Sequence, residues 1–510
     1  MANPIVTLDG VSLTTGQVTA VARYHAPVAI ADRGRASAAA AARVAAEVTA
    51  RRPVYGRTTG VGANRDQLVQ GDDLDRSGLR LIRSHAGGGG PLIAAELSRA
   101  MLVVRLNQLL AGGSGVDPGV LDVLAQAVNA GLAVAVPTHG AIGTGDLTAL
   151  AVTALCLLGE RDWVPASAGQ PRFALASSDA PAFMSSSAAT IGEAAVACHD
   201  LAGLLTAGTL IAAFSHLAVD GSTEPYAEPV HRRYRRPGQQ SVAAQLRLLL
   251  DHDGRPAARI QDPYGYRALP QVHGAAVDAV AAATDVLASD LNGTGENPLI
   301  DAAGHAAWHN GNFHTAYLGL ALDAVRAALF QTSALSAARL GTLVEPRFTG
   351  LAPFLADGPR PSSGVMILEY VAHAAIADIR RLAAPAALGS AVLSRGVEEH
   401  AGFSTQSARA TTDVVAAYGP VLACELVAAV RALRMRGIEP PPGPLADAHA
   451  RVSAALPAGL LDRPLDEDLA AAQQLIPGLA ELLQGVSEFS GADRPSSAGA
   501  IRTAEGVTAG

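Results

Sequence analysis

Residues 137–147 read Pro-Thr-His-Gly-Ala-Ile-Gly-Thr-Gly-Asp-Leu, and a long apolar helix pattern begins at Leu147. A hydroxyl residue, Thr144, stands between two glycines in this stretch. Because glycine enters the region of positive φ without a steric cost, such a loop can bend sharply. Gly145 leaves its own amide nitrogen unobstructed, and Gly143 leaves its carbonyl open to attack. The stretch predicts a tight turn whose backbone can form an electrophile from its own atoms.

The composition favours helices over strands. Hydrophobic residues make up 49% of the 510 residues and aromatic residues only 4%, with alanine and leucine dominant, whereas strands prefer aromatic and β-branched residues. From Leu147 to about Gly437, apolar residues recur three and four positions apart, as they do on the buried face of a helix. We therefore expect a mostly α fold, with a large central bundle of long helices and a smaller mixed N-terminal region.

Charge and residue usage exclude several kinds of chemistry. The formal net charge of -8 argues against a nucleic-acid partner. The chain contains no lysine, so all 38 cationic side chains are arginine. Without a lysine amine, an internal aldimine to pyridoxal phosphate cannot form.

The termini and the cysteines bear on the cellular compartment. The first residues lack the basic and apolar regions of a signal peptide, and no uninterrupted apolar run reaches membrane-spanning length. Cys156, Cys198 and Cys424 are too few and too scattered for a disulfide framework, so we interpret them as buried packing residues. We expect a cytoplasmic protein with no membrane partner.

Composition shifts divide the chain into four parts. We expect an N-terminal region with glycine-rich loops over residues 1–110 and a central helical bundle over residues 111–437. After the prolines at 440–442 we expect a smaller helical unit over residues 438–495, and a disordered tail over residues 496–510.

A series of short motifs follows one another along residues 5–440. They are Tyr55-Gly56 with the Thr-Gly loop after it, Ser84-His85-Ala86-Gly87, Gly145-Asp146-Leu147, Gln261-Asp262-Pro263-Tyr264-Gly265-Tyr266-Arg267, Pro270-Gln271-Val272, Glu296-Asn297-Pro298-Leu299, Gly311-Asn312-Phe313-His314 and Glu398-Glu399-His400. In this order they resemble the superfamily of aromatic amino acid ammonia-lyases and aminomutases, and by motif they are most similar to the histidine ammonia-lyases.

The resemblance implies a mostly helical homotetramer in which each active site is assembled from more than one subunit. It also implies that helix N-termini converge on the site, where their positive dipole ends would stabilise an electron-rich intermediate. The chemistry implied is the elimination of ammonia from an α-amino acid, or its migration, with a methylidene-imidazolone (MIO) formed autocatalytically from Ala-Ser-Gly.

In this chain the corresponding tripeptide is Gly143-Thr144-Gly145. Loss of water from serine leaves an exposed methylene, whereas threonine would leave an ethylidene whose methyl group crowds the carbon to be attacked. Threonine also resists a strained turn, because its β-branch restricts χ1. Ile142, where the family usually has glycine, adds bulk beside the turn. Two interpretations remain open: a working imidazolone-type group, or a scaffold without one that performs base-catalysed elimination, addition or cyclisation on an activated substrate.

A second departure lies at Ser185, where the family places an asparagine beside the prosthetic ring. Serine cannot supply an amide donor and acceptor together. Because Ser186 and Ser187 follow directly, any of the three serines could occupy that position.

The remaining site residues match the family. The resemblance implies that Tyr55 is the base that takes the β-proton and that Arg267 clamps the substrate carboxylate with a bidentate pair. Gln261 and Tyr264, about one helical turn apart, are expected to face the same pocket, with Tyr264 among the catalytic residues. Without the resemblance, each of these would be an ordinary packing or surface residue.

Further matches bear on the substrate. His85 and Glu398 match histidine ammonia-lyase, because a carboxylate can accept a hydrogen bond from an imidazole N–H and would discriminate against phenylalanine. In isolation, Glu398 would be a solvated glutamate beside Glu399. Phe313 is implied to pack beneath the prosthetic ring, whereas a lone phenylalanine is otherwise a core residue.

Two further kinds of site find little support. His305, His309 and His314 are close in sequence, and the first two would be one helical turn apart, but no cysteine or carboxylate completes a tetrahedral set, so we expect no metal. The glycines at 87–90 lack the Gly-Lys-Ser/Thr ending of a phosphate-binding loop.

The sequence thus predicts a carbon–nitrogen lyase that acts on histidine or another aromatic amino acid. The residues are also compatible with an aminomutase, or with a non-catalytic protein that serves as a binding or assembly partner.

Overall fold

The computed structural model describes residues 3–69, 71–73, 76–166, 169–251 and 254–487. The tail expected at residues 496–510 lies outside the described residues. The helices are α1 (Thr15–Tyr24), α2 (Asp32–Arg51), α3 (Ser77–His85), α4 (Ala95–Leu110), α5 (Gly119–Asn129), α6 (Leu147–Leu158), α7 (Ala180–Met184), α8 (Ala188–Ala218), α9 (Glu228–His231), α10 (Pro237–Leu250), α11 (Tyr264–Arg267), α12 (Leu269–Asn292), α13 (Ala316–Leu343), α14 (Pro346–Thr349), α15 (Ile367–Leu382), α16 (Ser404–Arg436), α17 (Pro444–Ala455) and α18 (Asp466–Ser487).

The strands are short and form ribbons of two. The parallel pair is β1 (Val6–Leu8) with β2 (Val28–Ile30), and the antiparallel pairs are β3 (Gly89–Leu92) with β4 (Pro137–His139) and β5 (Leu299–Asp301) with β6 (Ala306–Trp308). The mostly α fold expected from the composition is confirmed.

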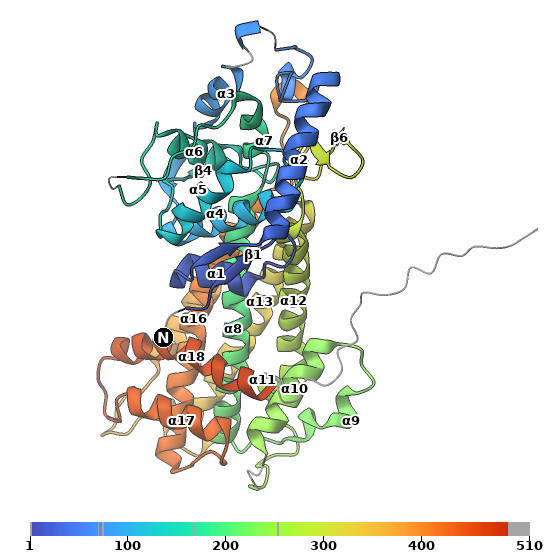
Figure 1. The fold of residues 1–510 in the computed structure, drawn as a ribbon. Coiled ribbons are helices and arrows are strands. Elements are labelled where there is room, and N and C mark those ends of the chain that lie inside the picture. Colours follow the sequence, from blue (N-terminus) through green and yellow to red (C-terminus); the bar gives the residue numbers. More distant parts are fainter. Residues whose placement is uncertain (1–2, 70, 74–75, 167–168, 252–253, 488–510) are drawn as a thin grey trace, which may run out of the picture.

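The long helices α8, α12, α13 and α16 pack along one another as the central bundle, with α10 and α15 against its sides (Figure 1). Their apolar residues belong to one continuous core that reaches from Val6 to Leu483. Cys156, Cys198 and Cys424 are buried free thiols within it, as expected. Helix α16 ends where Gly437 adopts a left-handed conformation, a common helix terminator.

No apolar run in the chain is uninterrupted over a membrane-spanning length, but three helical segments are apolar on average over such a length. The segments Ser177–Ala218, Ala316–Leu343 and Ser404–Arg436 are long and apolar enough to cross a membrane by length and composition. In their most apolar windows, 78%, 50% and 67% of the residues are buried inside the protein. A helix in the middle of a bundle contacts neighbours on several sides, which accounts for apolar residues beyond one face.

Candidate active site

The Gly143-Thr144-Gly145 turn is as sharp as its glycines predict. Gly143 has a φ of 90° and Gly145 a φ of 104°. A Cβ atom on Gly143 would lie 2.7 Å from Ser404 Oγ and 2.8 Å from Ser404 N. Alanine, which the family carries at this position, would therefore be strained here by both its φ angle and its neighbours.

The N-termini of several helices hold this turn. The carbonyl oxygen of Gly143 accepts hydrogen bonds from the backbone N–H and the hydroxyl of Thr315, which precedes α13, both at 3.2 Å. The carbonyl oxygen of Ile142 accepts a bond of 2.8 Å from the amide of Phe403, which precedes α16. The amide of Asp146 donates over 2.7 Å to Ser186 O, two residues before α8. The convergence of helix N-termini expected from the resemblance is present, and it places positive dipole ends at the turn.

Asp146 ties the turn to α8. Its carboxylate accepts hydrogen bonds from the amide of Thr190 (2.7 Å) and from the Thr190 hydroxyl (2.9 Å), which also lies 2.8 Å from Thr405 Oγ1. Burial raises the pKa of Asp146 to about 6, although the Thr190 bonds oppose the rise. The end of the turn is thus fixed by a buried carboxyl group.

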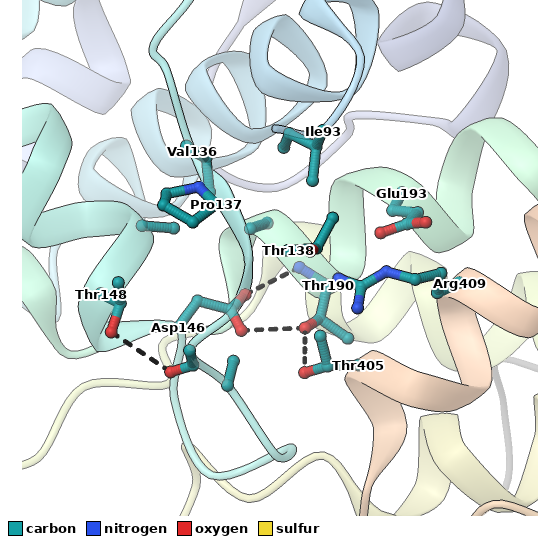
Figure 2. Close-up of a pocket in the computed structure, with 14 residues that line it drawn as sticks. Ile93, Val136, Pro137, Thr138, Asp146, Thr148, Thr190, Glu193, Thr405 and Arg409 are labelled. Carbon is teal, nitrogen blue, oxygen red and sulfur yellow. Dashed lines mark hydrogen bonds between the residues drawn. The ribbon is translucent and has the colours of Figure 1, made fainter. Parts of the chain in front are cut away.

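A small pocket lies between β4, the turn, α8 and α16. Figure 2 shows Asp146 directed at Thr190 within it, while Glu193 from α8 and Arg409 from α16 lie on the side opposite Thr148. Glu193 is buried, and burial raises its pKa to about 7 even though the charge of Arg409 acts against the rise. No sequence motif singles out Glu193 and Arg409, because they come from different helices that are far apart along the chain.

Tyr55 lies on the glycine-rich loop after α2. Its Oη accepts a hydrogen bond of 2.8 Å from the amide of Gly62. Glu398 Oε1 approaches the same residue, 3.2 Å from the position of a Cβ on Gly62. Burial is the main cause that raises the pKa of Tyr55, and the charge of Glu398 contributes in the same direction. The structure therefore brings Tyr55 and Glu398 together, although they are far apart in sequence.

The three candidate serines have different surroundings. Ser185 Oγ accepts a bond of 3.0 Å from the amide of Asn297, and Ser186 donates to Gln108 Oε1 over 2.6 Å. Ser187 donates to the carbonyl oxygen of Phe313 over 3.2 Å, so Phe313 lies beside this run. Ser186 and Ser187 are buried and Ser185 is half-buried.

A buried ion pair supports this corner of the site. Arg105 Nη1 lies 2.8 Å from Glu296 Oε1, and Arg105 also donates to the carbonyl oxygens of Ala182 and Phe183. It joins α7, which carries Ser185 at its end, to the loop that holds Asn297. His85 is the last residue of α3, and because Leu81 O can only accept, the Nδ1 of His85 donates that 2.9 Å bond. Helices α3, α6 and α7 lie at one end of the molecule (Figure 1).

The predicted residues Gln261, Tyr264 and Arg267 lie away from the Gly-Thr-Gly turn. Helix α11, with Tyr264 and Arg267, packs near the far end of α13, where Arg339 Nη1 donates to Gly265 O over 3.1 Å. Thr315, at the start of α13, binds Gly143 instead. At 1.5 Å per residue these two anchoring points are roughly 35 Å apart. Within one chain, the structure therefore does not bring α11, with Tyr264 and Arg267, or Gln261 three residues before it, to the Gly-Thr-Gly turn.

Two local expectations were wrong. Gln261 does not share a helical turn with Tyr264, because α11 begins only at Tyr264, and a residue before proline, here Asp262, avoids helical geometry. Likewise, His305 and His309 are not on a helix, because β5 and β6 form a hairpin there. His305 Nδ1 lies 3.3 Å from Glu47 Oε2, His309 contacts Tyr55, and His314 Nε2 lies 3.0 Å from His400 Nδ1.

Arg267 and Tyr264 do form a local unit. The Arg267 guanidinium carbon lies 4.5 Å from the centre of the Tyr264 ring. Tyr264 is 68% exposed, and the Nε of Arg267 is buried without a hydrogen-bond partner among the described residues. The guanidinium and the ring are within the range of a cation–π interaction.

A helical bundle whose helix N-termini converge on a Gly-x-Gly turn, with a phenol and a carboxylate on neighbouring loops, agrees with the class that the resemblance implies: enzymes that cleave carbon–nitrogen bonds. The model of the family described as aromatic amino acid lyase matches residues 13–456. A histidine ammonia-lyase of Sorangium cellulosum is 35% identical and covers 95% of this chain and 99% of its own length.

Solved structures agree in fold. Tyrosine aminomutase from Streptomyces globisporus matches with a TM-score of 0.88 at 27% identity, over 95% of this chain and 98% of that chain. The ergothioneine-degrading enzyme ergothionase from Treponema denticola matches with a TM-score of 0.86 at 25% identity, over 94% and 99%. The chain belongs to the aromatic amino acid lyase family, and it is an enzyme of the ammonia-lyase class.

Proposed function

We propose that this enzyme eliminates ammonia from L-histidine or a related aromatic amino acid. The observation that carries the proposal is the carboxylate of Glu398 beside Tyr55, with Gly62 in contact with both. An imidazole substrate would donate a hydrogen bond to this carboxylate, whereas a phenyl ring could not. His85, Ser185 and Phe313 are the further substrate contacts that we propose at this end of the molecule.

The backbone of the turn suits an autocatalytic imidazolone. The carbonyl that would be attacked, that of Gly143, is polarised by both donors of Thr315, and among the described residues no group accepts a hydrogen bond from the amide of Gly145, the nitrogen that would attack. Thr144 is the one member of the tripeptide that departs from the family in its side-chain chemistry. When formed, the group would supply an electrophilic carbon to the substrate.

Tyr55 would take the β-proton of the substrate. The amide of Gly62 stabilises its phenolate, but burial and the charge of Glu398 raise the pKa of the phenol, so the reactive form is a minor one at neutral pH. We therefore expect the rate to rise toward alkaline pH.

We further propose a cytoplasmic homotetramer in which Gln261, Tyr264 and Arg267 of one chain complete the site of another. Two observations support it: the separation of α11 from the turn along α13, and exposed apolar side chains on the bundle such as Tyr317 (81%), Leu320 (61%) and Tyr370 (67%). Arg267 would then clamp the substrate carboxylate. The four-part division of the chain at residues 110, 437 and 495 remains our working description of its organisation.

The test is an assay of purified protein with each aromatic amino acid, following ammonia and the conjugated acid product. Production of ammonia from histidine, lost in Tyr55→Phe, is the expected result. No ammonia from any of these amino acids would overturn the proposal.

Thr144 favours a second candidate, an elimination, addition or cyclisation on an activated substrate by Tyr55 and Tyr264 without the prosthetic group. Intact mass distinguishes the two: a chain lighter by two waters, mapped to residues 143–145, supports the first. The similarity to a tyrosine aminomutase keeps ammonia migration as a variant of the first candidate, which a β-amino acid product would identify.

A further inference from the structure

His309 is held directly against Tyr55. The backbone amide of Tyr55 donates a hydrogen bond to His309 Nε2 over 3.2 Å, and the two rings meet edge to face, with centroids 6.4 Å apart and planes at 76°. At its other end, Tyr55 Oη accepts the bond from Gly62. The tyrosine is therefore fixed at its main chain by His309 and at its phenol by Gly62.

The hydrogen bond determines the state of the imidazole. A backbone N–H can only donate, so Nε2 of His309 must be unprotonated, and the neutral ring carries its proton on Nδ1. An imidazolium, protonated on both nitrogens, cannot accept this bond.

The segment that carries His309 is firmly anchored. Asn310 Nδ2 donates to Glu296 O over 2.9 Å, and the Asn310 amide donates to Asn297 Oδ1 over 3.0 Å. Through Asn297 this segment connects to Ser185, and through Glu296 to the buried Arg105. The imidazole is thus a fixed point against which the Tyr55 loop is placed.

We propose that His309 is a positioning residue for Tyr55: its neutral imidazole holds the tyrosine backbone in place, and protonation of the ring releases it. This inference rests on the proposed role of Tyr55 as the base. His309 need not touch the substrate.

The surroundings of His309 set the direction of its pH dependence. Burial is the first cause that lowers the pKa of His309, and the charge of Arg52, at the end of α2, is the second. Arg52 faces the same segment, since it donates to the carbonyl oxygen of Ala307. Arg52 and the Tyr55 phenol are the ionisable groups that the described residues place against this ring. The neutral form therefore prevails at neutral pH, and positioning is lost as the pH falls below the usual range of histidine.

Three variants separate the effect of the acceptor nitrogen of His309 from the effects of its ring and of the hairpin. His309→Gln keeps an acceptor that does not titrate, His309→Phe keeps the ring but removes the acceptor, and His305→Gln is a matched change at an exposed histidine on the same hairpin. In His309→Phe we expect kcat to fall on the order of ten- to a hundredfold with little change in KM. In His309→Gln we expect near wild-type kcat at neutral pH. The additional fall in kcat that protonation of His309 causes at acid pH should be lost, while the dependence on the Tyr55 phenol remains. His305→Gln should match the wild type.

A second measurement does not depend on turnover. In protein with 3-fluorotyrosine at position 55, the ¹⁹F resonance should shift as the pH falls from 8 to 5, with an inflection that persists in His305→Gln and disappears in His309→Gln and His309→Phe. An inflection unchanged in His309→Gln would overturn the inference, as would an acid limb unchanged in that variant. An inactive enzyme that shows the expected ¹⁹F pattern would contradict the proposed function while supporting the contact.

Discussion

The hydroxyl of Thr315 donates a hydrogen bond to the carbonyl oxygen of Gly143 over 3.2 Å, beside a bond of equal length from the Thr315 amide. This pair of donors resembles the arrangement that stabilises an oxyanion, because negative charge develops on that oxygen when the carbonyl carbon is attacked.

Thr315→Val removes the hydroxyl but keeps the side-chain shape and the amide. We expect the loss of water from residues 143–145 to be roughly ten- to a hundredfold slower in this variant. Intact-mass measurements at intervals during maturation would record this rate. Thr206→Val, at a half-buried threonine on α8, is the control, and equal maturation of both variants would contradict the role of Thr315.

In the proposed imidazolone, the methyl group of Thr144 would be the main chemical obstacle to an efficient electrophile. Thr144→Ser removes this methyl group, which would otherwise crowd the carbon that accepts the substrate. We expect a larger fraction of dehydrated chain and faster release of ammonia, measured by intact mass and by steady-state kinetics. A serine variant no better than the parent in either assay would show that the methyl group is not limiting.

Glu398 is expected to decide which ring is accepted. In Glu398→Gln the carboxylate no longer rejects an apolar ring, so the ratio of kcat/KM for phenylalanine to that for histidine should rise roughly tenfold or more. Glu399→Gln, which makes the same change of charge at the neighbouring residue, is the control and should leave this ratio unchanged. An unchanged ratio in Glu398→Gln would remove the carboxylate from substrate recognition.

Glu193 should make stability depend on pH. Its folded-state pKa is raised to about 7, so the folded state binds the proton more tightly than the unfolded state does. The stabilising effect is complete below about pH 4.5 and is lost as the pH rises through about 7. Glu193→Gln mimics the protonated form. Above pH 8 it should therefore raise the free energy of unfolding by on the order of 2–3 kcal/mol, and with it the melting temperature, whereas near pH 4 it should have little effect. Thermal melts across this range test it, and a variant destabilised by the same amount at every pH would refute it.

Sharing of sites between chains can be tested by complementation. Tyr55→Phe and Arg267→Ala chains should each be inactive alone. When they are expressed together, random mixing leaves sites that combine an intact Tyr55 from one chain with an intact Arg267 from another, and about a quarter of the wild-type activity should return. Absence of any recovery in confirmed mixed oligomers would place both residues in the site of a single chain.

Much of the fold follows from local pattern. The spacing of apolar residues after Leu147 predicts α6 and the bundle, and the glycines at 143 and 145 predict the positive φ angles, because both depend on neighbours within a few residues. The same local reasoning failed where a longer contact decides the conformation. His309 follows a strand rather than sitting on a helix because residues 306–308 pair with residues 299–301.

The candidate site is predictable only as a set of motifs. The bond from Thr315 to Gly143 spans 172 positions and that from Tyr55 to His309 spans 254, and no short-range pattern encodes either. A hydroxyl residue directly before a long apolar helix was the one available signal for Thr315. The separation of Arg267 from the turn depends on the length of α13 and on where α11 packs against it. The motifs themselves predict neither of these two features.

Helix α13 acts as a rigid spacer, with the anchor of the turn at one end and the support of Arg267 at the other. Under the proposed sharing of sites, a solitary chain would be folded but inactive, because the turn and Arg267 lie near opposite ends of α13. Specific activity should therefore depend on protein concentration. Dilution below the dissociation constant of the assembly should abolish turnover, while the circular dichroism spectrum remains that of a folded helical protein.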